Sequence, residues 1–279
     1  MVNALTIDVE EYFHANAMDG VVRPSEWDQL PHRVEQNTYK MLDILSEFDA
    51  RATFFVLGWV AERWPRLVVE IARRGHEIAC HGHAHRLVYR LGPERFRSDV
   101  LRARQLLEDL LGRPIAGFRA ASYSIVEGSL WALDVLIDLG FEYDSSIFPI
   151  RHDLYGIPSF SRFPVRVRRP AGEILEIPPS TIRLLRRNWP VAGGGYFRLA
   201  PYWMTRLSLQ WLNRREGFPG MVYLHPWELD TEQPRLRAGT IARVRQYTNL
   251  RETEPRLRRM LGEFRFAPIC EVFHSGADA

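Results

Sequence analysis

Two histidines spaced four residues apart, His81 and His85, are the side chains in this sequence that point most directly to chemistry. Their spacing places both imidazoles on one side of a helical turn or a tight loop. A second polar cluster, with carboxylates at Asp8, Glu10 and Glu11, follows an apolar segment near the N-terminus. Two imidazoles and one carboxylate are the ligand set of a catalytic zinc ion with an open coordination position. The residue types therefore predict a divalent metal site.

The elements that must position these residues follow a strand–helix alternation. Apolar segments typical of strands alternate with segments of helical periodicity. We expect strands at 4–7, 52–56, 77–79, 115–118, 141–143, 221–224 and 267–273, and helices at 32–48, 61–74, 93–111, 127–139, 201–214 and 236–264. This alternation predicts an α/β fold with a parallel sheet and helices outside it. An open, doubly wound sheet and a closed barrel remain as alternatives, although no G-x-G-x-x-G follows the first strand.

The regular alternation ends near residue 150. Beyond it, prolines recur and a run of three glycines occupies 193–195. The length of 279 residues suits one large domain. We interpret residues 1–279 as a single domain, with an irregular insertion at 151–220 and an extension of helix and strand at 231–279.

Composition narrows the classes of function. The formal net charge of +3 is too small to predict nucleic-acid binding, and two cysteines do not make a disulfide framework. Cys80 stands beside His81, but a small buried strand residue is the commoner role for such a cysteine. We see no signal-peptide pattern at the N-terminus and no apolar run long enough to span a membrane. We therefore expect a cytoplasmic protein.

Polar side chains recur where the expected strands end. The residues at these positions are Asp8, Glu10, His81, His85, Arg119, Asp144 and His225. In parallel α/β folds, the carboxyl ends of the strands form the edge at which active sites are built. Five separate strand ends with polar residues favour a site more strongly than any single motif does.

These strand-end segments resemble the motifs of the NodB-homology polysaccharide deacetylases, a carbohydrate esterase family. The matching segments are Thr6–Glu10, His81–His85, Phe118–Tyr123, Tyr143–Ser146 and Leu224–His225. The resemblance covers residues 1–150 and 221–230. The middle of the chain, with Gly193–Arg198 and His225–Glu228, is similar to the subgroup associated with exosortase-linked exopolysaccharide loci.

The resemblance implies a distorted (β/α)7 barrel and a divalent metal, usually zinc, with cobalt, nickel and manganese as alternatives. It implies hydrolysis of the N-acetyl group of N-acetylhexosamine residues in a polysaccharide or its precursor, in exopolysaccharide biosynthesis. The expected partner is thus an N-acetylated glycan. Such a glycan would reach a cytoplasmic enzyme as a lipid-linked precursor, at the inner face of the membrane.

The resemblance also implies a role for each strand-end residue. The metal would polarise the acetyl carbonyl and lower the pKa of water toward roughly 7. Asp8 would be the general base, and His225 would be the general acid that protonates the leaving amine. The backbone N–H of Ser122 would stabilise the oxyanion. Arg119 would keep Asp8 ionised, and Asp144 would orient His225 and keep it protonated.

Two positions depart from the usual motifs. The common first motif has adjacent aspartates, but Val9 occupies the second position and cannot bind a metal. We favour Glu10 over Glu11 as the ligand beside His81 and His85, because strand alternation places Glu10 on the same face as Asp8. The usual proline of the third motif is Ala121, which should loosen that loop without removing its N–H groups.

The remaining aromatic and histidine side chains have simpler interpretations. Tyr123, Tyr196, Phe197 and Trp227 are candidates for substrate binding, chiefly by stacking on sugar rings. We expect the side chain of His83 to face solvent. Five further histidines have no partner pattern and are expected to be structural or exposed: His14, His32, His76, His152 and His274.

Two other functions compete with deacetylation. Some proteins with this barrel hydrolyse non-sugar amides such as ureide rings, and a barrel without activity could serve as a glycan-binding protein. The complete set of ligand and acid–base residues argues against both, and release of acetate distinguishes deacetylation from either.

Overall fold

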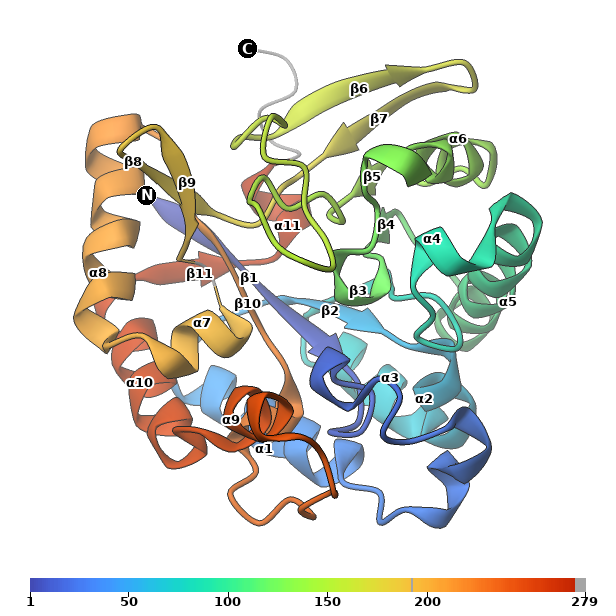
Figure 1. The fold of residues 1–279 in the computed structure, drawn as a ribbon, viewed down its shortest axis with the longest axis horizontal. Coiled ribbons are helices and arrows are strands. Elements are labelled where there is room, and N and C mark those ends of the chain that lie inside the picture. The colour runs from blue at the N-terminus through green and yellow to red at the C-terminus, as the bar shows by residue number, and fades with distance from the viewer. Residues whose placement is uncertain (192, 274–279) are drawn as a thin grey trace.

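A mostly parallel β-sheet forms the centre of the protein (Figure 1). The structure, a computed structural model, describes residues 1–191 and 193–273. The hydrogen-bonded strand order is β10 (Met221–Leu224), β1 (Val2–Val9), β2 (Thr53–Val56), β3 (Glu77–Cys80), β4 (Gly117–Phe118), β5 (Tyr143–Asp144), β7 (Gly172–Glu176) and β6 (Val165–Arg169). Neighbours in this order are parallel except for β6 and β7. Among the described residues, the order ends at β10 and at β6.

Strand β1 is the central element of this sheet. Ile7 pairs with Leu224 of β10 and with Phe54 of β2. The first residues of β1 pair with β11 (Arg265–Ala267). Strands β11 and β2 lie on the same side of β1, with β11 beside its start and β2 beside its end. All residues of β1 after Val2 are buried. Because β1 and its neighbours are parallel, their carboxyl ends meet at one edge of the sheet.

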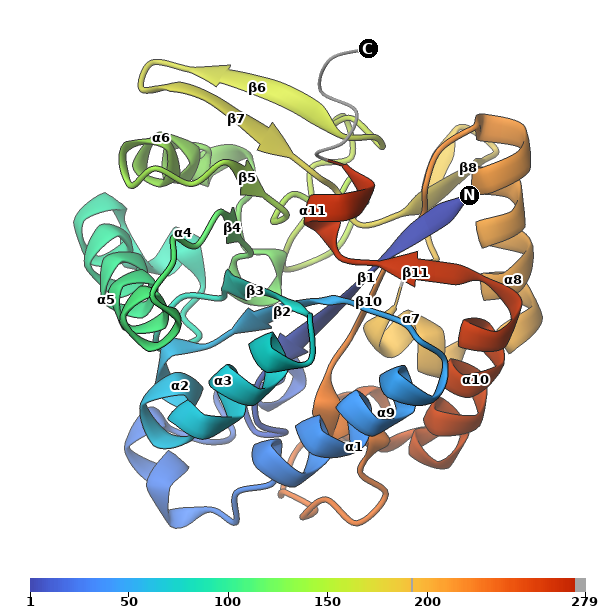
Figure 2. The ribbon, with the colours of Figure 1, turned by 180° about the vertical axis from the view of Figure 1, so that it is seen from behind.

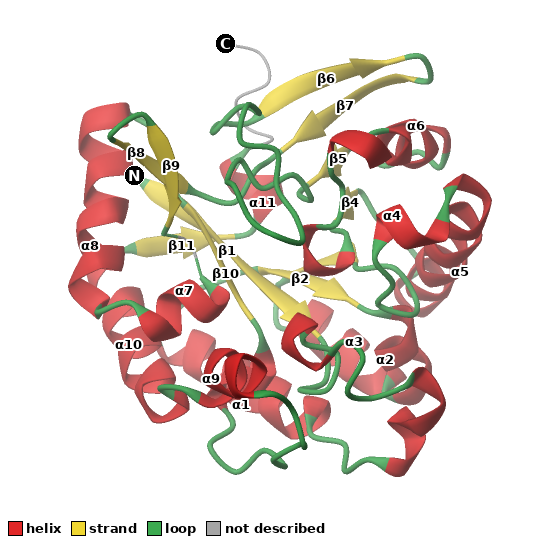
Figure 3. Ribbon diagram, viewed as in Figure 1, coloured by secondary structure: helices red, strands yellow, loops and turns green. Residues whose placement is uncertain are grey.

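Helices surround the sheet (Figure 3). The α-helices are α1 (Val34–Glu47), α2 (Gly58–Arg63), α3 (Pro65–Arg73), α4 (Val88–Leu91), α5 (Pro93–Leu111), α6 (Trp131–Asp138), α7 (Gly194–Leu199), α8 (Tyr202–Trp211), α9 (Thr240–Tyr247), α10 (Leu250–Glu263) and α11 (Ile269–Val272). Helical segments of 3-10 or π geometry are η1 (Asn16–Met18), η2 (Pro24–Gln29), η3 (Ala121–Tyr123), η4 (Glu127–Ser129), η5 (Leu212–Glu216) and η6 (Pro226–Leu229). The main core joins buried strand residues such as Ile7 and Phe54 to helix residues such as Leu42 and Val100. The predicted α/β class is confirmed.

Two long predicted helices are interrupted. The predicted helix 61–74 lies across α2 and α3, because Pro65 begins a new helix. The predicted helix 236–264 consists of α9 and α10, and Asn249 between them has a φ of 57° in the left-handed region. The predicted strand 267–273 is mostly wrong, because β11 ends at Ala267 and α11 begins after Pro268. His274 lies outside the described residues.

The segment 151–220 contains more regular structure than its prolines predict. Strand β7 pairs with β5 and so belongs to the central sheet, while β8 (Thr181–Leu184) and β9 (Arg187–Pro190) form a separate hairpin. Gly193 forms a single parallel bridge with Tyr223 of β10. A Cβ atom at Gly193 would lie 1.8 Å from the carbonyl oxygen of Tyr223, so only glycine fits there.

Within the described residues, every helix is too short or too polar to span a bilayer.

Candidate active site

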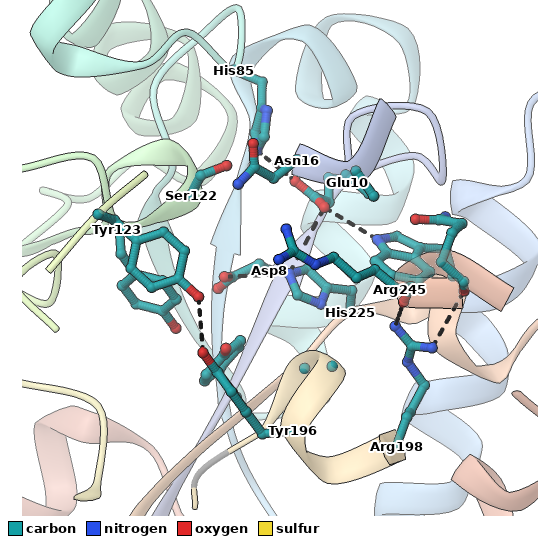
Figure 4. Close-up of a pocket in the computed structure, with 18 of the residues that line it drawn as sticks. Asp8, Glu10, Asn16, His85, Ser122, Tyr123, Tyr196, Arg198, His225 and Arg245 are labelled. Carbon is teal, nitrogen blue, oxygen red and sulfur yellow. Dashed lines mark hydrogen bonds and ion pairs between the residues drawn. The ribbon is translucent and has the colours of Figure 1, made fainter. Parts of the chain in front are cut away.

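Three side chains converge at the carboxyl edge of the sheet. Glu10 follows β1, His81 follows β3, and His85 lies four residues after His81 in the loop that follows β3. One ligand atom from each residue lies within 4.8 Å of the other two. The close-up places Glu10 between His85 and His225 (Figure 4). His85 reaches this position from a backbone with a φ of 47°, in the left-handed region. One carboxylate and two imidazoles in this arrangement could hold a metal ion.

A backbone carbonyl fixes the tautomer of His81. The Nδ1 atom lies 2.8 Å from the carbonyl oxygen of Arg119. Because a carbonyl only accepts hydrogen bonds, Nδ1 carries the proton and donates it. The lone pair of Nε2 is then free, and Nε2 lies 3.9 Å from Oε2 of Glu10. Burial lowers the pKa of His81 to about 4, so the ring is neutral at neutral pH, the form that binds a metal.

Glu10 is held by two neighbours. Its Oε2 lies 2.7 Å from Nε2 of His85, and its Oε1 accepts a hydrogen bond of 3.1 Å from the indole N–H of Trp227. Burial alone would raise the pKa of Glu10. The charge and hydrogen bond of His85, together with the charges of His225 and His81, lower the pKa by more than burial raises it. The net pKa is well below its usual range, so Glu10 is a carboxylate at neutral pH.

The neighbouring carboxylate, Glu11, has a different role. Its Oε1 accepts hydrogen bonds from the backbone N–H groups of Arg33, at 2.8 Å, and Val34, at 3.0 Å. These groups stand at the start of α1, so Glu11 caps that helix. Glu10 and Glu11 therefore point to different surroundings, as strand alternation predicts.

Asp8 is paired with a fully buried arginine. The Nη1 atom of Arg119 donates to Oδ1 of Asp8 at 2.6 Å and to Oγ1 of Thr6 at 2.9 Å. The other side of the guanidinium donates to the hydroxyl of Ser145 at 3.0 Å, and the group lies 4.0 Å from the ring centroid of Phe55. The other carboxylate oxygen of Asp8, Oδ2, faces His225.

His225 lies between two carboxylates on one side and a third on the other. Its Nε2 is 3.8 Å from Oδ2 of Asp8 and 3.8 Å from Oε1 of Glu10. Its Nδ1 is 2.5 Å from Oε1 of Glu228. Burial lowers the pKa of His225, but the hydrogen bond with Glu228 and the nearby carboxylates raise it more, to about 9. The predicted role of Asp144 in orienting His225 is therefore wrong, because Glu228 occupies that position.

Asp144 instead pairs with a neighbour across the sheet. Asp144 and Glu176 are partners in the register of β5 and β7. Burial raises the pKa of Asp144 to about 6, and burial together with Asp144 raises the pKa of Glu176, so the two carboxyls share a proton. Asp144 also accepts a hydrogen bond from the hydroxyl of Ser146, and that hydroxyl accepts one from the N–H of Ala120 at 2.8 Å. Asp144 thus supports the loop that follows Arg119.

The polar residues border a pocket of about 330 Å³. Tyr123, Tyr196 and Trp227 line it, as predicted for substrate-binding residues, and so does Ser122. The backbone of Ser122 has a φ of 52°, which turns the chain sharply at the pocket wall. Phe197 is fully buried in the main core, so the prediction that it stacks on a sugar is wrong. Trp227 is 5% exposed, and its ring stacks on His225 at a centroid distance of 5.2 Å.

Several site residues escaped prediction. Glu228 could have been found from its position three residues after His225, because a turn such as η6 aligns residues i and i+3. Arg198 supports Glu228 with a hydrogen bond of 3.0 Å. Arg245 is an exposed cation at the pocket, with no sequence signal to mark it.

Two histidines outside the ligand cluster are also buried. His14 stacks on His85 at a centroid distance of 5.7 Å, which supports its expected structural role. His83 is 7% exposed, and its Nε2 lies 3.2 Å from Glu62. The expectation that His83 faces solvent is therefore wrong.

Parts of the chain are similar to known proteins. Residues 25–143 match the family model described as polysaccharide deacetylase, and residues 145–274 match a domain of unknown function. Residues 25–143 of the chain are therefore similar to polysaccharide deacetylases. A peptidoglycan-N-acetylglucosamine deacetylase of Bacillus cereus is 33% identical over 98 residues, which are 35% of this chain and 36% of that relative. The chain thus spans well under half the length of the curated relatives it matches.

Solved structures have a similar fold. The crystal structure of a protein from Mycobacterium smegmatis, assigned as a polysaccharide deacetylase, has a TM-score of 0.67 and 20% identity. That similarity covers 98% of this chain and 88% of the other. A family 4 carbohydrate esterase pseudoenzyme from Bacillus anthracis has a TM-score of 0.51 and 14% identity, covering 97% of this chain and 64% of the other.

The site draws on both matched segments and on residues before them. Asp8 and Glu10 precede the polysaccharide deacetylase match, His81 and His85 lie within it, and His225 lies in the domain of unknown function. The residues that follow β1 and β10 therefore complete a site to which the segment matched to polysaccharide deacetylases contributes two imidazoles.

Proposed function

We propose that this protein is a metal-dependent hydrolase that removes N-acetyl groups from N-acetylhexosamine residues of a polysaccharide or its precursor. One observation carries the proposal. A candidate metal cluster of Glu10, His81 and His85 lies beside Asp8 and His225, which have separate buried partners. Metal-assisted amide hydrolysis requires such an arrangement of ligands, a base and an acid within one pocket.

The donor set fits a divalent metal. His81 presents the lone pair of Nε2, because its Nδ1 proton is committed to the carbonyl of Arg119. Glu10 is ionised and is oriented by Trp227. These outer hydrogen bonds are typical of zinc sites, and we propose zinc as the metal, with cobalt, nickel or manganese as alternatives. When bound, the cation supplies Lewis-acid chemistry that polarises a carbonyl and acidifies water.

The protein side chains then divide the proton transfers. Asp8, fixed by its ion pair with Arg119, accepts the proton of the attacking water. The N–H of Ser122 stabilises the oxyanion that forms at the acetyl carbonyl. His225, kept protonated by Glu228, donates its proton to the amide nitrogen as the carbon–nitrogen bond breaks. The products are acetate and a free amino sugar.

The pocket suits a hexosamine residue. Tyr123, Tyr196 and Trp227 offer aromatic surfaces beside the polar cluster. The Bacillus cereus relative is named for N-acetylglucosamine, and we propose the same sugar class here. We further propose that the reaction serves exopolysaccharide biosynthesis in the cytoplasm, on a precursor held at the inner face of the membrane.

The experiment measures acetate release from N-acetylglucosamine oligosaccharides by wild type and two neighbouring variants. Glu10→Gln should lower activity by about 100-fold or more and reduce bound metal, because it removes a charged ligand. Glu11→Gln is the matched control and should keep both, since an amide oxygen can still cap α1. Binding of the oligosaccharide by the wild-type protein without release of acetate would contradict the proposal. That result would indicate a glycan-binding protein without enzymatic activity.

A further inference from the structure

Exposed apolar side chains concentrate on one part of the surface. Nine of the 17 large hydrophobic residues exposed in the described chain lie between Leu184 and Phe218. We call the part formed by α8 and the β8–β9 hairpin the α8–hairpin surface. Its apolar members are Leu184, Leu185, Trp189, Trp203, Met204, Leu207 and Trp211, with exposed fractions between 42% and 87%. Such a concentration on a monomer marks an interaction site.

Helix α8 presents a regular apolar stripe to the outside. Trp203, Leu207 and Trp211 are spaced by four residues, so they lie on one face of the helix, and each is at least half exposed. The buried residues Tyr202 and Leu209 lie on another face. This helix is therefore apolar on its outer face as well as on its inner one.

The hairpin carries the most exposed apolar residue of the group. Leu185 is 87% exposed, and both Leu185 and Arg186 have positive φ values, 50° and 63°. The strands of the hairpin lie beside α8 in both views (Figures 1 and 2). Trp189 of the hairpin and Met204 of α8 line a groove of about 1030 Å³, and residues between 149 and 163 form much of its remaining wall. Tyr196 lines both this groove and the active-site pocket, so the two are adjacent.

The charge around these apolar residues is strongly positive. Arg183, Arg186, Arg187, Arg214 and Arg215 are exposed, and none has an acidic partner within residues 1–191 and 193–273. Glu216 is the only acidic residue between 177 and 218, and it lies 2.8 Å from Arg162. Within the described residues, the surface therefore offers several arginines that make no ion pair, although Asp153 lines the same groove as three of them.

We propose that the α8–hairpin surface docks on an anionic phospholipid bilayer. Tryptophan prefers the membrane interface, leucines at a protruding turn enter the boundary of the acyl chains, and arginines bind lipid phosphates. A second copy of the chain fits less well, because a two-fold interface on this surface would bring arginines against arginines. Given the proposed function, the docked enzyme receives its glycan from a carrier in the same bilayer, through the groove next to Tyr196.

Co-sedimentation with vesicles tests the docking directly. We expect the wild-type protein to bind vesicles of phosphatidylcholine and phosphatidylglycerol, to bind pure phosphatidylcholine weakly, and to be released by salt. Changing Arg183, Arg186 and Arg187 together to Gln should weaken binding about 100-fold, since each surface arginine contributes about fivefold. The combination Leu185→Ser, Trp203→Ser and Leu207→Ser should also weaken binding to the anionic vesicles.

Matched controls separate docking from general surface effects. Arg66→Gln with Arg113→Gln, and Val69→Ser with Leu101→Ser, change exposed residues on other parts of the surface and should bind like the wild type. Binding that is absent in the wild type, or lost equally in the controls, would overturn the proposal. A dimer that sediments without vesicles, and that the combination Leu185→Ser, Trp203→Ser and Leu207→Ser abolishes, would also overturn the proposal, because a second copy would then cover this surface.

The assay is independent of the proposed chemistry. All docking variants should release acetate from a short water-soluble oligosaccharide at the wild-type rate. Vesicle binding without any acetate release would refute the proposed function and leave the docking intact. Acetate release without vesicle binding would refute the docking proposal and leave the proposed function intact.

Discussion

The Nδ1 atom of His225 lies 2.5 Å from Oε1 of Glu228, three residues later in the chain. The short helical segment η6 creates this pairing, because residues i and i+3 are aligned in such a turn. Arg198 in turn donates to the other oxygen of Glu228 and to backbone carbonyls of residues 245, 246 and 248. A buried carboxylate thus fixes the orientation of His225 and favours its protonated form.

Glu228→Gln tests this relationship. The variant removes the negative charge that raises the pKa of His225, so the proton donor should lose its proton at lower pH. The alkaline limb of the pH–rate profile should therefore move to lower pH, and kcat/KM at neutral pH should fall about 10- to 100-fold. Glu232→Gln, an exposed change nearby, is the control and should keep the wild-type profile. An unchanged alkaline limb in Glu228→Gln would contradict the assignment.

Asp144→Asn provides the complementary test. The asparagine can accept the hydrogen bond from Ser146 and donate to Glu176, so the loop after Arg119 should keep its place. We expect the alkaline limb of the rate profile to match the wild type. Asp144→Ala should lower the free energy of unfolding by about 1–3 kcal/mol, because Ser146 and Glu176 lose a buried partner. A shift of the alkaline limb in Asp144→Asn would restore the sequence-based role in orienting His225.

Glu228 and Asp144 show which part of the site the sequence could predict and which part it could not. The strand-end rule located Asp8, Glu10, His81, His85 and His225 at one edge, because parallel strands bring their carboxyl ends together. It could not assign partners among the buried acids. No strand was expected at 172–176, so the pairing of β5 with β7, and hence of Asp144 with Glu176, had no signal in the sequence pattern.

Tyr196 and Phe197 illustrate a second reason why the sequence did not predict the whole site. Tyr196 and Phe197 are adjacent in α7, and neither hydropathy nor type says which of them faces the pocket. Packing decides, because Phe197 fills the core while the hydroxyl of Tyr196 lies 3.4 Å from that of Tyr155. The helix break at Asn249 likewise depends on a local left-handed backbone that helical periodicity does not encode.

This difference between neighbours gives a paired prediction. Tyr196→Ala should raise KM about tenfold by removing an aromatic contact with the sugar, with little change in stability. Phe197→Ala should lower the free energy of unfolding by about 3–5 kcal/mol, because it opens a cavity in the core. KM for the folded fraction of Phe197→Ala should stay near the wild-type value. Equal effects of both changes on KM would show that Phe197 also meets the substrate.

The burial of His76 predicts that the free energy of unfolding depends on pH. Burial, with Arg74 and Arg51, lowers the pKa of His76 to about 4, while its Nδ1 accepts a hydrogen bond from the N–H of Ala52. Its folded pKa is below the unfolded value, so the unfolded state binds more protons between pH 6.5 and 4. Stability should therefore fall as pH decreases through that window, by up to about 3 kcal/mol from this residue.

His76→Asn isolates that contribution. The amide oxygen can replace Nδ1 as the acceptor for Ala52, but it does not titrate. Denaturant unfolding at pH 7 and at pH 4 should show a smaller loss of stability in the variant than in the wild type. Parallel losses in both proteins would mean that His76 titrates as an exposed histidine does.

The most direct test of the central claim is to measure metal content and acetate release on the same preparation, before and after chelation. Acetate release from N-acetylglucosamine oligosaccharides should fall in proportion to the metal removed and should return when zinc or cobalt is added. Full activity in protein whose metal content has fallen to background would contradict a metal-dependent deacetylase built on Glu10, His81 and His85.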